Sequence, residues 1–374
     1  MKKIVAGLLT GGLLLGAAAA AGGTAQDPLI PLSYFINVYQ ATVQHQADSR
    51  VDAATGQQYQ TALSDMETAQ EAAINRLGGT SGLDDQRLKR GDVVTLPSGS
   101  TALLLAGSAS CTFPSGALVD VTDGKTVASG VAASLRHRYL AAEGTTAALT
   151  ITSDTAVVCV EGAVTVAKSK EIDYNALADA LKEMGLFQGT GQSYGSGYEL
   201  ERQATRVEGI VMFLRLINEE NAALAYTGTC PFADAPDWSK RYLAYAYSKG
   251  YTNGVGVNAA GQELFGSNNI IDATQYVTFV LRALGYSDSG STPDFSWSGA
   301  LSAGQSLGLL TQGEVSLLGS GTFLRAQMAY VSYYALDGMC KNSGETLLKA
   351  LEKGGWDAKT AQEARAFVTV SRPV

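Results

Sequence analysis

The chain has 374 residues, of which 46% are hydrophobic and only 17% are charged, and its formal net charge is −8. This length exceeds that of one typical domain, and the composition is that of a globular protein rather than of a disordered chain. The negative charge argues against a nucleic-acid partner, because neutralising phosphates needs a concentrated basic surface and the chain has no run of Lys or Arg.

The first 25 residues have the three-part layout of a secretory signal peptide. Lys2 and Lys3 form a basic start, residues 4–21 are uncharged and apolar or small, and residues 23–25 (Gly-Thr-Ala) form a cleavage site. The alternative is an uncleaved membrane anchor, since about 18 apolar residues can just span a bilayer. Cleavage is favoured because the segment is rich in Gly and Ala. We therefore expect a secreted protein with no transmembrane segment after cleavage.

Residues 26–90 are predicted to form a helical segment, because apolar side chains recur every three or four positions along part of it. These positions are Tyr59, Leu63, Met66, Ala69, Ala73 and Leu77. The glycine-rich stretch at residues 78–82 is expected to end the helix. The stripe is too short for sustained heptads, so it indicates packing on a neighbouring helix rather than a coiled coil.

Residues 91–168 are predicted to form a small β-rich domain, an antiparallel barrel or sandwich. Short runs of Val, Thr, Leu and Ala alternate there with Gly, Ser and Asp, and residues 123–124 (Asp-Gly) are a hairpin signal. Whether the cysteines pair stays open; Cys111 and Cys159 both lie in this domain, and Cys230 and Cys340 lie beyond it. No C-x-x-C pair occurs, so we expect no zinc site.

From residue 169 onward helical patterns return and contain an internal repeat. In each copy a glycine turn follows one predicted helix and precedes another. Glycines are expected there because the chain often takes a positive φ at the end of a helix, which glycine adopts at little cost. The turns lie at residues 185–191, 250–256 and, more loosely, 308–313. The repeats span residues 169–218, 230–286 and 293–341. A helical tail is predicted for residues 342–374.

This ordered series resembles surface-layer homology (SLH) repeats. The second copy is the most complete, with residues 231–234 (Pro-Phe-Ala-Asp), Trp238, the glycine turn and residues 264–266 (Leu-Phe-Gly). The resemblance covers residues 169–341 and implies three repeats around a pseudo-threefold axis. It also implies grooves that bind secondary cell-wall polymers, often pyruvylated. The expected fold class is therefore α+β and multidomain: a helical segment, a small β domain and a mostly α bundle of three repeats.

The predicted polymer-binding residues lie at the second helix of the first and third repeats or at the opening of the second repeat. They are Thr205, Arg206, Glu208, Asp234, Trp238, Arg325 and Gln327. Thr205 and Glu208 have the spacing of a capping box, which a well-capped helix alone explains. Arg206 opposes the helix dipole at a cost of ~0.3–1 kcal/mol, but beside free N–H groups it can complete an anion site. A structural salt bridge is the alternative for Arg206 and Arg325.

Two interpretations remain open for each of the other candidates. Trp238 either stacks on a sugar or packs in the core, and Asp234 either caps the helix that carries Trp238 or contacts polymer hydroxyls. The second and third copies depart from the family pattern, because Ala273 stands where an arginine is expected and Leu324 where a Ser or Thr cap is expected. At most two grooves therefore keep a cation.

No motif for catalysis was found. His45 and His137 are the only histidines and lie in different segments, and no nucleophile elbow, metalloprotease or phosphate-loop pattern occurs. We expect no enzyme, no cofactor and no metal. The leading hypothesis is a cell-surface protein anchored non-covalently to a secondary cell-wall polymer. The alternatives are an envelope assembly protein whose repeats mediate protein contacts, and an envelope hydrolase with its site in the β domain.

Overall fold

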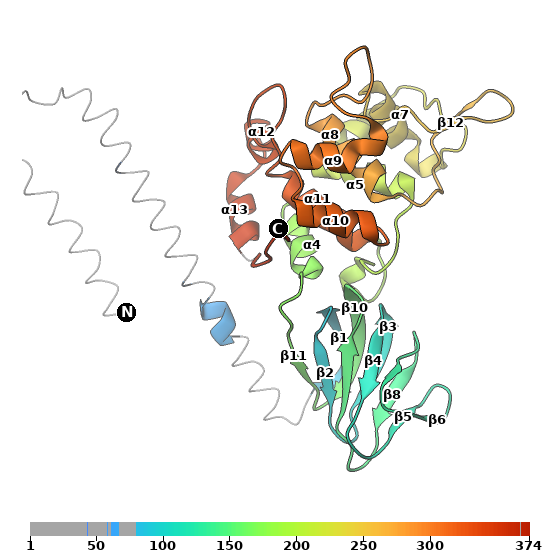
Figure 1. Ribbon diagram of the computed structural model, residues 1–374, viewed down its shortest axis with the longest axis vertical. Coiled ribbons are helices and arrows are strands. Elements are labelled where there is room, and N and C mark those ends of the chain that lie inside the picture. Colours follow the sequence, from blue (N-terminus) through green and yellow to red (C-terminus); the bar gives the residue numbers. More distant parts are fainter. Residues whose placement is uncertain (1–42, 44–57, 59–60, 67–79, 367) are drawn as a thin grey trace, which may run out of the picture. The chain divides into compact units, whose positions relative to one another are not determined.

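The computed structural model describes residues 43, 58, 61–66, 80–366 and 368–374 (Figure 1). The chain divides into two compact units, residues 1–68 and residues 69–374, and every element discussed below belongs to the second. The predicted signal peptide and most of the predicted helical stripe lie outside the described residues, although residues 61–66 are helical. In the described part of the chain, no helix is both long and apolar enough to cross a membrane.

The β region consists of two antiparallel sheets with strand orders β1-β10-β3-β8-β5-β6 and β11-β2-β9-β4-β7 (Figure 1). The strands are β1 (Thr80–Lys89), β2 (Val93–Leu96), β3 (Thr101–Ala106), β4 (Ala109–Thr112), β5 (Leu118–Asp120), β6 (Lys125–Val127), β7 (Val131–Ala132), β8 (Arg138–Ala141), β9 (Ala147–Ile151), β10 (Thr155–Gly162) and β11 (Thr165–Ala167). Alternate residues of β2 and β9 are buried, as period-two patterning requires. Both sheets contribute to one hydrophobic core.

Of the two forms predicted for this region, the barrel is wrong, because β1 and β6 end one sheet and β11 and β7 end the other. The two antiparallel sheets share one core, as the sandwich alternative requires. The helical segment predicted up to residue 90 is also wrong at its end, since Thr80–Lys89 form strand β1. This strand pairs with the largely buried β10 along residues 84–89. The charged sequence has no clear apolar alternation, so its strand conformation depends on that partner.

The helical region has one continuous core that extends from Tyr174 to Ala364. Its helices are α4 (Tyr174–Glu183), α5 (Arg206–Leu216), α6 (Glu220–Ala225), α7 (Lys240–Ser248), α8 (Ala273–Ala283), α9 (Ala300–Ser306), α10 (Gln312–Ser320), α11 (Arg325–Ala335), α12 (Leu347–Lys353) and α13 (Ala358–Ala366). Shorter elements are η2 (Gly195–Gly197), η3 (Asp237–Ser239), η4 (Trp297–Gly299) and the hairpin β12 (Gly256–Val257) with β13 (Glu263–Leu264). Residues 368–374 have no regular secondary structure.

The predicted glycine turns are confirmed. Gly185, Gly250 and Gly308 follow α4, α7 and α9 with φ values of 72°, 74° and 74°, which glycine adopts at little cost. In the third copy α10 directly follows the turn, which accounts for its looser glycine spacing. The second helices begin at Arg206, Ala273 and Arg325, immediately after the predicted starts.

The β region and the helical region contact each other through polar side chains. The Arg87 guanidinium forms two hydrogen bonds of 2.8 Å with the Asp179 carboxylate of α4. The Asn175 amide donates to the Leu88 carbonyl at 3.4 Å. All four cysteines have free thiols, so the open question of disulfide pairing is answered for this structure.

Candidate ligand-binding site

A pocket of about 460 Å³ lies beside the start of α5. Its walls come from five separate segments: the α5 start, the glycine turn after α7, helix α8, the loop after α8 and the η4 turn. The lining residues are Arg206, Asn253, Gly254, Val255, Gln275, Thr278, Phe279, Arg282, Asp288 and Trp297. We refer to this cavity as the Arg206 pocket.

Arg206 is held rigidly at the pocket wall and is 7% exposed. Its Nε donates to the Phe265 carbonyl at 2.9 Å, and its Nη1 donates to Gln275 Oε1 at 3.1 Å. The guanidinium lies 4.9 Å from the centre of the Phe265 ring and 5.1 Å from that of Phe279. Burial, and then the charge of Arg282, lowers the pKa of Arg206 to about 10. The side chain is therefore still cationic at neutral pH.

The carboxylates of Asp272 and Asp234 act on the charge of Arg206 and oppose the lowering of its pKa, but neither pairs with it directly. Arg282 is neutralised by Asp288, with a contact of 2.7 Å, and it also donates to the Tyr251 carbonyl. Among the described residues, Arg206 forms no ion pair with a carboxylate. Trp297 is 59% exposed and offers an aromatic surface. A buried cation, two amide side chains and an exposed indole suit an anionic ligand with an apolar face, such as an acidic sugar.

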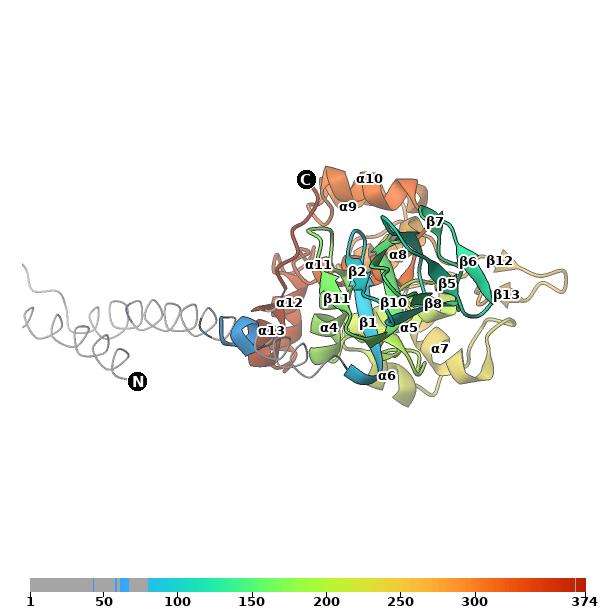
Figure 2. The ribbon, with the colours of Figure 1, turned by 90° about the horizontal axis from the view of Figure 1, so that it is seen from below.

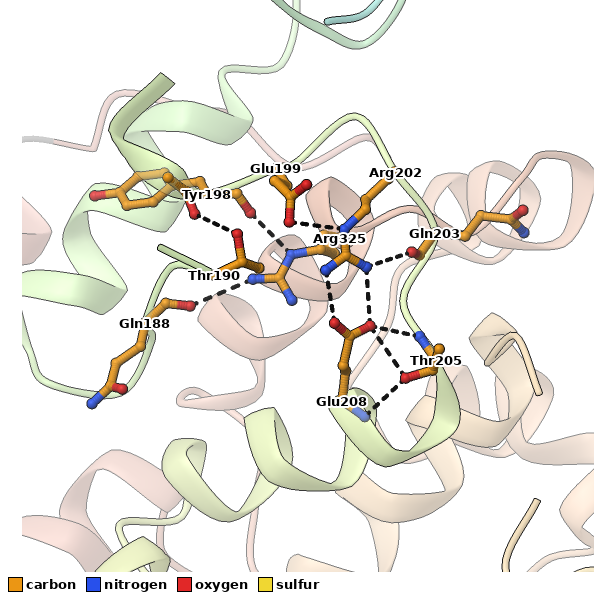
Figure 3. A network of polar contacts seen from close by, with 10 residues as sticks. Gln188, Thr190, Tyr198, Glu199, Arg202, Gln203, Thr205, Glu208 and Arg325 are labelled. Atoms are coloured by element: carbon orange, nitrogen blue, oxygen red, sulfur yellow. Dashed lines mark hydrogen bonds and ion pairs between the residues drawn. The ribbon is translucent and has the colours of Figure 1, made fainter. Parts of the chain in front are cut away.

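Arg325 has similar main-chain partners but different charged neighbours (Figure 3). Its Nε donates to the Tyr198 carbonyl at 2.9 Å, and its guanidinium lies 5.6 Å from the centre of the Phe187 ring. Burial, and then the charge of Arg202, lowers the pKa of Arg325 to about 10, while Glu208 and Glu199 act in the opposite direction. Like Arg206, it forms no ion pair of its own among the described residues.

The acids near Arg325 belong to an ion-pair network centred on Arg202 (Figure 3). Arg202 contacts Glu199 at 3.0 Å and Glu208 at 2.7 Å. Glu208 is the third residue of α5, whereas the third residue of α8 is the neutral Gln275. Glu199 and Glu208 are both paired with Arg202, and Asp288, the carboxylate that lines the Arg206 pocket, is paired with Arg282. The difference between the two places is therefore the third helix position, where the charged Glu208 of α5 corresponds to the neutral Gln275 of α8, and this difference favours an anion at the Arg206 pocket.

Thr205 and Glu208 form the predicted capping box. The Glu208 amide donates to Thr205 Oγ1 at 3.4 Å, and Glu208 Oε2 accepts from the Thr205 amide at 2.8 Å. Burial acts to raise the pKa of Glu208, but the hydrogen bonds from Arg202 and Thr205 outweigh it and lower the pKa to about 2. Both residues thus have complete structural roles at the start of α5.

The low pKa of Glu208 predicts a specific acid sensitivity. A carboxyl group with a depressed pKa in the folded state stabilises the protein above its unfolded pKa of about 4.3, and this contribution is lost as the pH falls toward 2. The free energy of unfolding of a Glu208→Gln variant should therefore fall less steeply between pH 4.5 and 2 than that of the parent, as followed by urea unfolding. Glu143→Gln, at an exposed carboxyl, is the control and should leave the slope unchanged. Equal slopes for the parent and Glu208→Gln would contradict this assignment.

The remaining predicted residues are not gathered in the pocket. Asp234 accepts from the amides of Phe265, Gly266 and Ser267 at 2.7, 2.8 and 2.8 Å, so it fixes the loop before α8 rather than capping its own helix. Trp238 is 58% exposed, which rules out the buried core role.

Gln327 also acts within the fold. Its Oε1 accepts from the Leu324 amide at 2.9 Å, and its Nε2 donates to Asp154 of the β region at 2.6 Å. The bond to the Leu324 amide is one half of a capping box at the start of α11, whereas the half that a Ser or Thr side chain would supply is missing. Sequence reasoning missed Gln275, Arg282 and Trp297. A signal for Trp297 existed, because it occupies the short turn before α9 as Trp238 does before α7.

A second polar cluster lies in the β region. Ligand atoms of Asp120, Asp123 and His137 lie within 4.8 Å of one another. His137 Nδ1 is 2.7 Å from Asp120 Oδ2, and Lys125 pairs with Asp123 at 2.5 Å. His137 is thus partnered by a buried carboxylate, that of Asp120. The cluster is satisfied by its own hydrogen bonds.

Comparisons with known proteins do not assign a family. No family model matches the chain, and no curated protein matches it. Among solved structures, the chain is similar to procruciferin, an 11S globulin from Brassica napus, with 14% identity and a TM-score of 0.15. That similarity covers 27% of this chain and 26% of the globulin chain, and it carries no argument about fold or function.

Proposed function

We propose that this is an exported, non-catalytic surface protein whose helical region, residues 169–341, binds an anionic secondary cell-wall polymer. The Arg206 pocket would hold one acidic sugar of that polymer. The observation that carries the proposal is a buried guanidinium without a carboxylate partner in a pocket that also presents an exposed indole. A sugar carboxylate or ketal pyruvate supplies the missing charge, and Trp297 packs on a sugar face. The polymer class comes from the resemblance to SLH repeats.

Two contacts between copies support the proposed pseudo-threefold arrangement. The start of α5 pairs with the loop before α8, through a bridge between Thr205 and Ile270. The start of α11 pairs with the loop before α5 in the same way, through Leu324 and Gln203. In each case an arginine Nε donates to a loop carbonyl of another copy at 2.9 Å. Repeated contacts of this kind are expected where each repeat completes its neighbour.

The direct test is co-sedimentation of the full chain with purified cell wall, before and after acid extraction of the secondary polymer. We expect sedimentation with intact wall and its loss after extraction. Failure to sediment with intact wall, or equal sedimentation with extracted wall, would count against a polymer anchor. The second outcome would indicate binding to peptidoglycan or another wall component.

Two tryptophans in corresponding turns provide a matched pair of variants. Trp297 lines the Arg206 pocket, and Trp238 does not, although the two side chains are 59% and 58% exposed. Trp297→Ala should weaken polymer binding about tenfold, or about 1.4 kcal/mol, because aromatic side chains dominate such contacts. Trp238→Ala should leave the affinity within about twofold of the parent. A binding isotherm with soluble polymer measures both, and equal effects would move the ligand away from this pocket.

A structural or assembly role is the second candidate. Arg206 and Arg325 both donate to main-chain carbonyls, so each also fixes a loop of a neighbouring copy. If these arginines serve only that purpose, an Arg206→Ala, Arg325→Ala double variant that still folds would keep its wall binding.

A further inference from the structure

The last described segment of the chain, residues 368–374, lies against α10 and α11 rather than continuing a helix (Figure 2). Its Val368 and Val370 side chains pack against the helical core. The Tyr334 hydroxyl donates to the Val370 carbonyl at 3.1 Å, and Thr311 Oγ1 donates to the Pro373 carbonyl. Its main charged contact is made by Arg372.

The surface that receives Arg372 has the features of a guanidinium site. Glu314 is fully buried, and its two oxygens accept from Arg372 Nε and Nη2 at 2.7 and 2.6 Å. Arg372 also donates to the Leu309 carbonyl at 2.7 Å. The guanidinium lies 4.7 Å from the centre of the Tyr334 ring. A bidentate carboxylate, a carbonyl and an aromatic face together match the planar fork of arginine.

The Glu314 carboxylate is positioned by donors from the start of α10 and from α11. The Tyr330 hydroxyl donates to Glu314 Oε1 at 2.6 Å, and the Thr311 amide donates to Glu314 Oε2 at 2.7 Å. Burial acts to raise the pKa of Glu314, but these donors and Arg372 hold it below its usual value. Gly313 lets the segment approach, since an added Cβ there would lie 2.6 Å from the Val374 carbonyl oxygen. The host surface is thus shaped for an extended main chain.

Residues of this surface occupy the same positions in α11 as residues of the Arg206 pocket occupy in α8. Thr278 and Arg282, the sixth and tenth residues of α8, line that pocket. Tyr330 and Tyr334 are the sixth and tenth residues of α11. The corresponding surface of the third copy is therefore covered by residues 368–374 of the same chain. Its charge is opposite to that of the Arg206 pocket, because its buried charged group is the Glu314 carboxylate.

We propose that Glu314, Tyr330, Tyr334 and the Leu309 carbonyl form a guanidinium-binding site, and that Arg372 is its resident, displaceable ligand. The class of ligand is an arginine side chain in an extended peptide segment. Displacing the resident segment uncovers the surface of the third copy, so that an arginine-bearing segment of another chain can take its place. This site is independent of polymer binding at the Arg206 pocket.

The test is rescue in trans by a peptide. Arg372→Ala in the full chain should lower Tm, because Glu314 loses its cation. A synthetic peptide of residues 369–374 (Thr-Val-Ser-Arg-Pro-Val), added at millimolar concentration, should then raise Tm by about 2–5 °C as it binds the folded state. The same peptide with alanine in place of arginine should have no effect.

Arg365→Ala is the matched control, since Arg365 also pairs with a carboxylate, Asp337, and lies 5.2 Å from the centre of the Tyr333 ring. The peptide should not change its Tm. No rescue of Arg372→Ala, equal rescue by both peptides, or an equal shift in Arg365→Ala would each overturn the proposal. If Arg372→Ala shows no cooperative unfolding, the titration is made on Arg372→Lys, which keeps the charge but not the fork, and the same outcomes apply.

Discussion

Replacing Arg206 by alanine is expected to abolish polymer binding and to lower the free energy of unfolding by about 1.5–5 kcal/mol. The stability loss has two sources. The buried Phe265 carbonyl loses its donor, which costs about 1–3 kcal/mol. The contacts with the Phe265 and Phe279 rings are worth about 0.5–2 kcal/mol when desolvated. Urea unfolding measures the loss, and co-sedimentation with cell wall measures binding.

Arg325→Ala separates the two effects. Its guanidinium has equivalent partners, the Tyr198 carbonyl and the Phe187 ring, so its loss should destabilise the fold by a similar amount. Polymer binding should nevertheless persist in the folded fraction, because Glu199 and Glu208 already disfavour an anion there. If Arg325→Ala loses binding as completely as Arg206→Ala, the two sites are equivalent and the charge argument for the Arg206 pocket is wrong.

Features that depend on local chemistry were predictable from the sequence. A capping box uses side chains three residues apart, so Thr205 and Glu208 identify the start of α5 without knowledge of the rest of the fold. The turn glycines are similarly local, because positive φ is costly for other residues, and Gly185, Gly250 and Gly308 all adopt it. The mixed α and antiparallel β character followed from the change in periodicity near residue 170.

Features that depend on distant partners were not predictable. Strand β1 is a strand because β10 is buried beside it, and the sequence of residues 84–89 alone carries little sign of this. Asp234 was expected either to cap a helix or to contact polymer hydroxyls, yet its partners are amides more than 30 residues away. Arg282 and Trp297 reach the pocket from different elements. Periodicity identifies elements but does not identify which of their polar residues meet.

Gly254→Ala is expected to cause the second large effect, because it distorts the turn that forms one wall of the Arg206 pocket. Gly254 has a φ of 76°, and an added Cβ would lie 2.6 Å from the Leu264 carbonyl oxygen and 2.8 Å from the Phe232 ring. The unfavourable backbone conformation costs about 1–2 kcal/mol, and relieving the overlap costs a further 1–3 kcal/mol, about 2–5 kcal/mol in all. The Leu264 carbonyl also accepts from the Val255 amide at 2.8 Å, so moving it displaces a lining residue.

Gly250→Ala isolates the contribution of backbone conformation. Gly250 lies in the same turn with a φ of 74°, but an added Cβ there has no atom within 4 Å. It should therefore cost only about 1–2 kcal/mol and leave polymer affinity unchanged. Urea unfolding and wall co-sedimentation of both variants provide the comparison. A larger cost and a loss of binding confined to Gly254→Ala would tie affinity to the shape of this turn. Equal costs with binding retained in both would mean that the turn yields to the added methyl group and that the ligand does not depend on the Gly254 wall of the pocket.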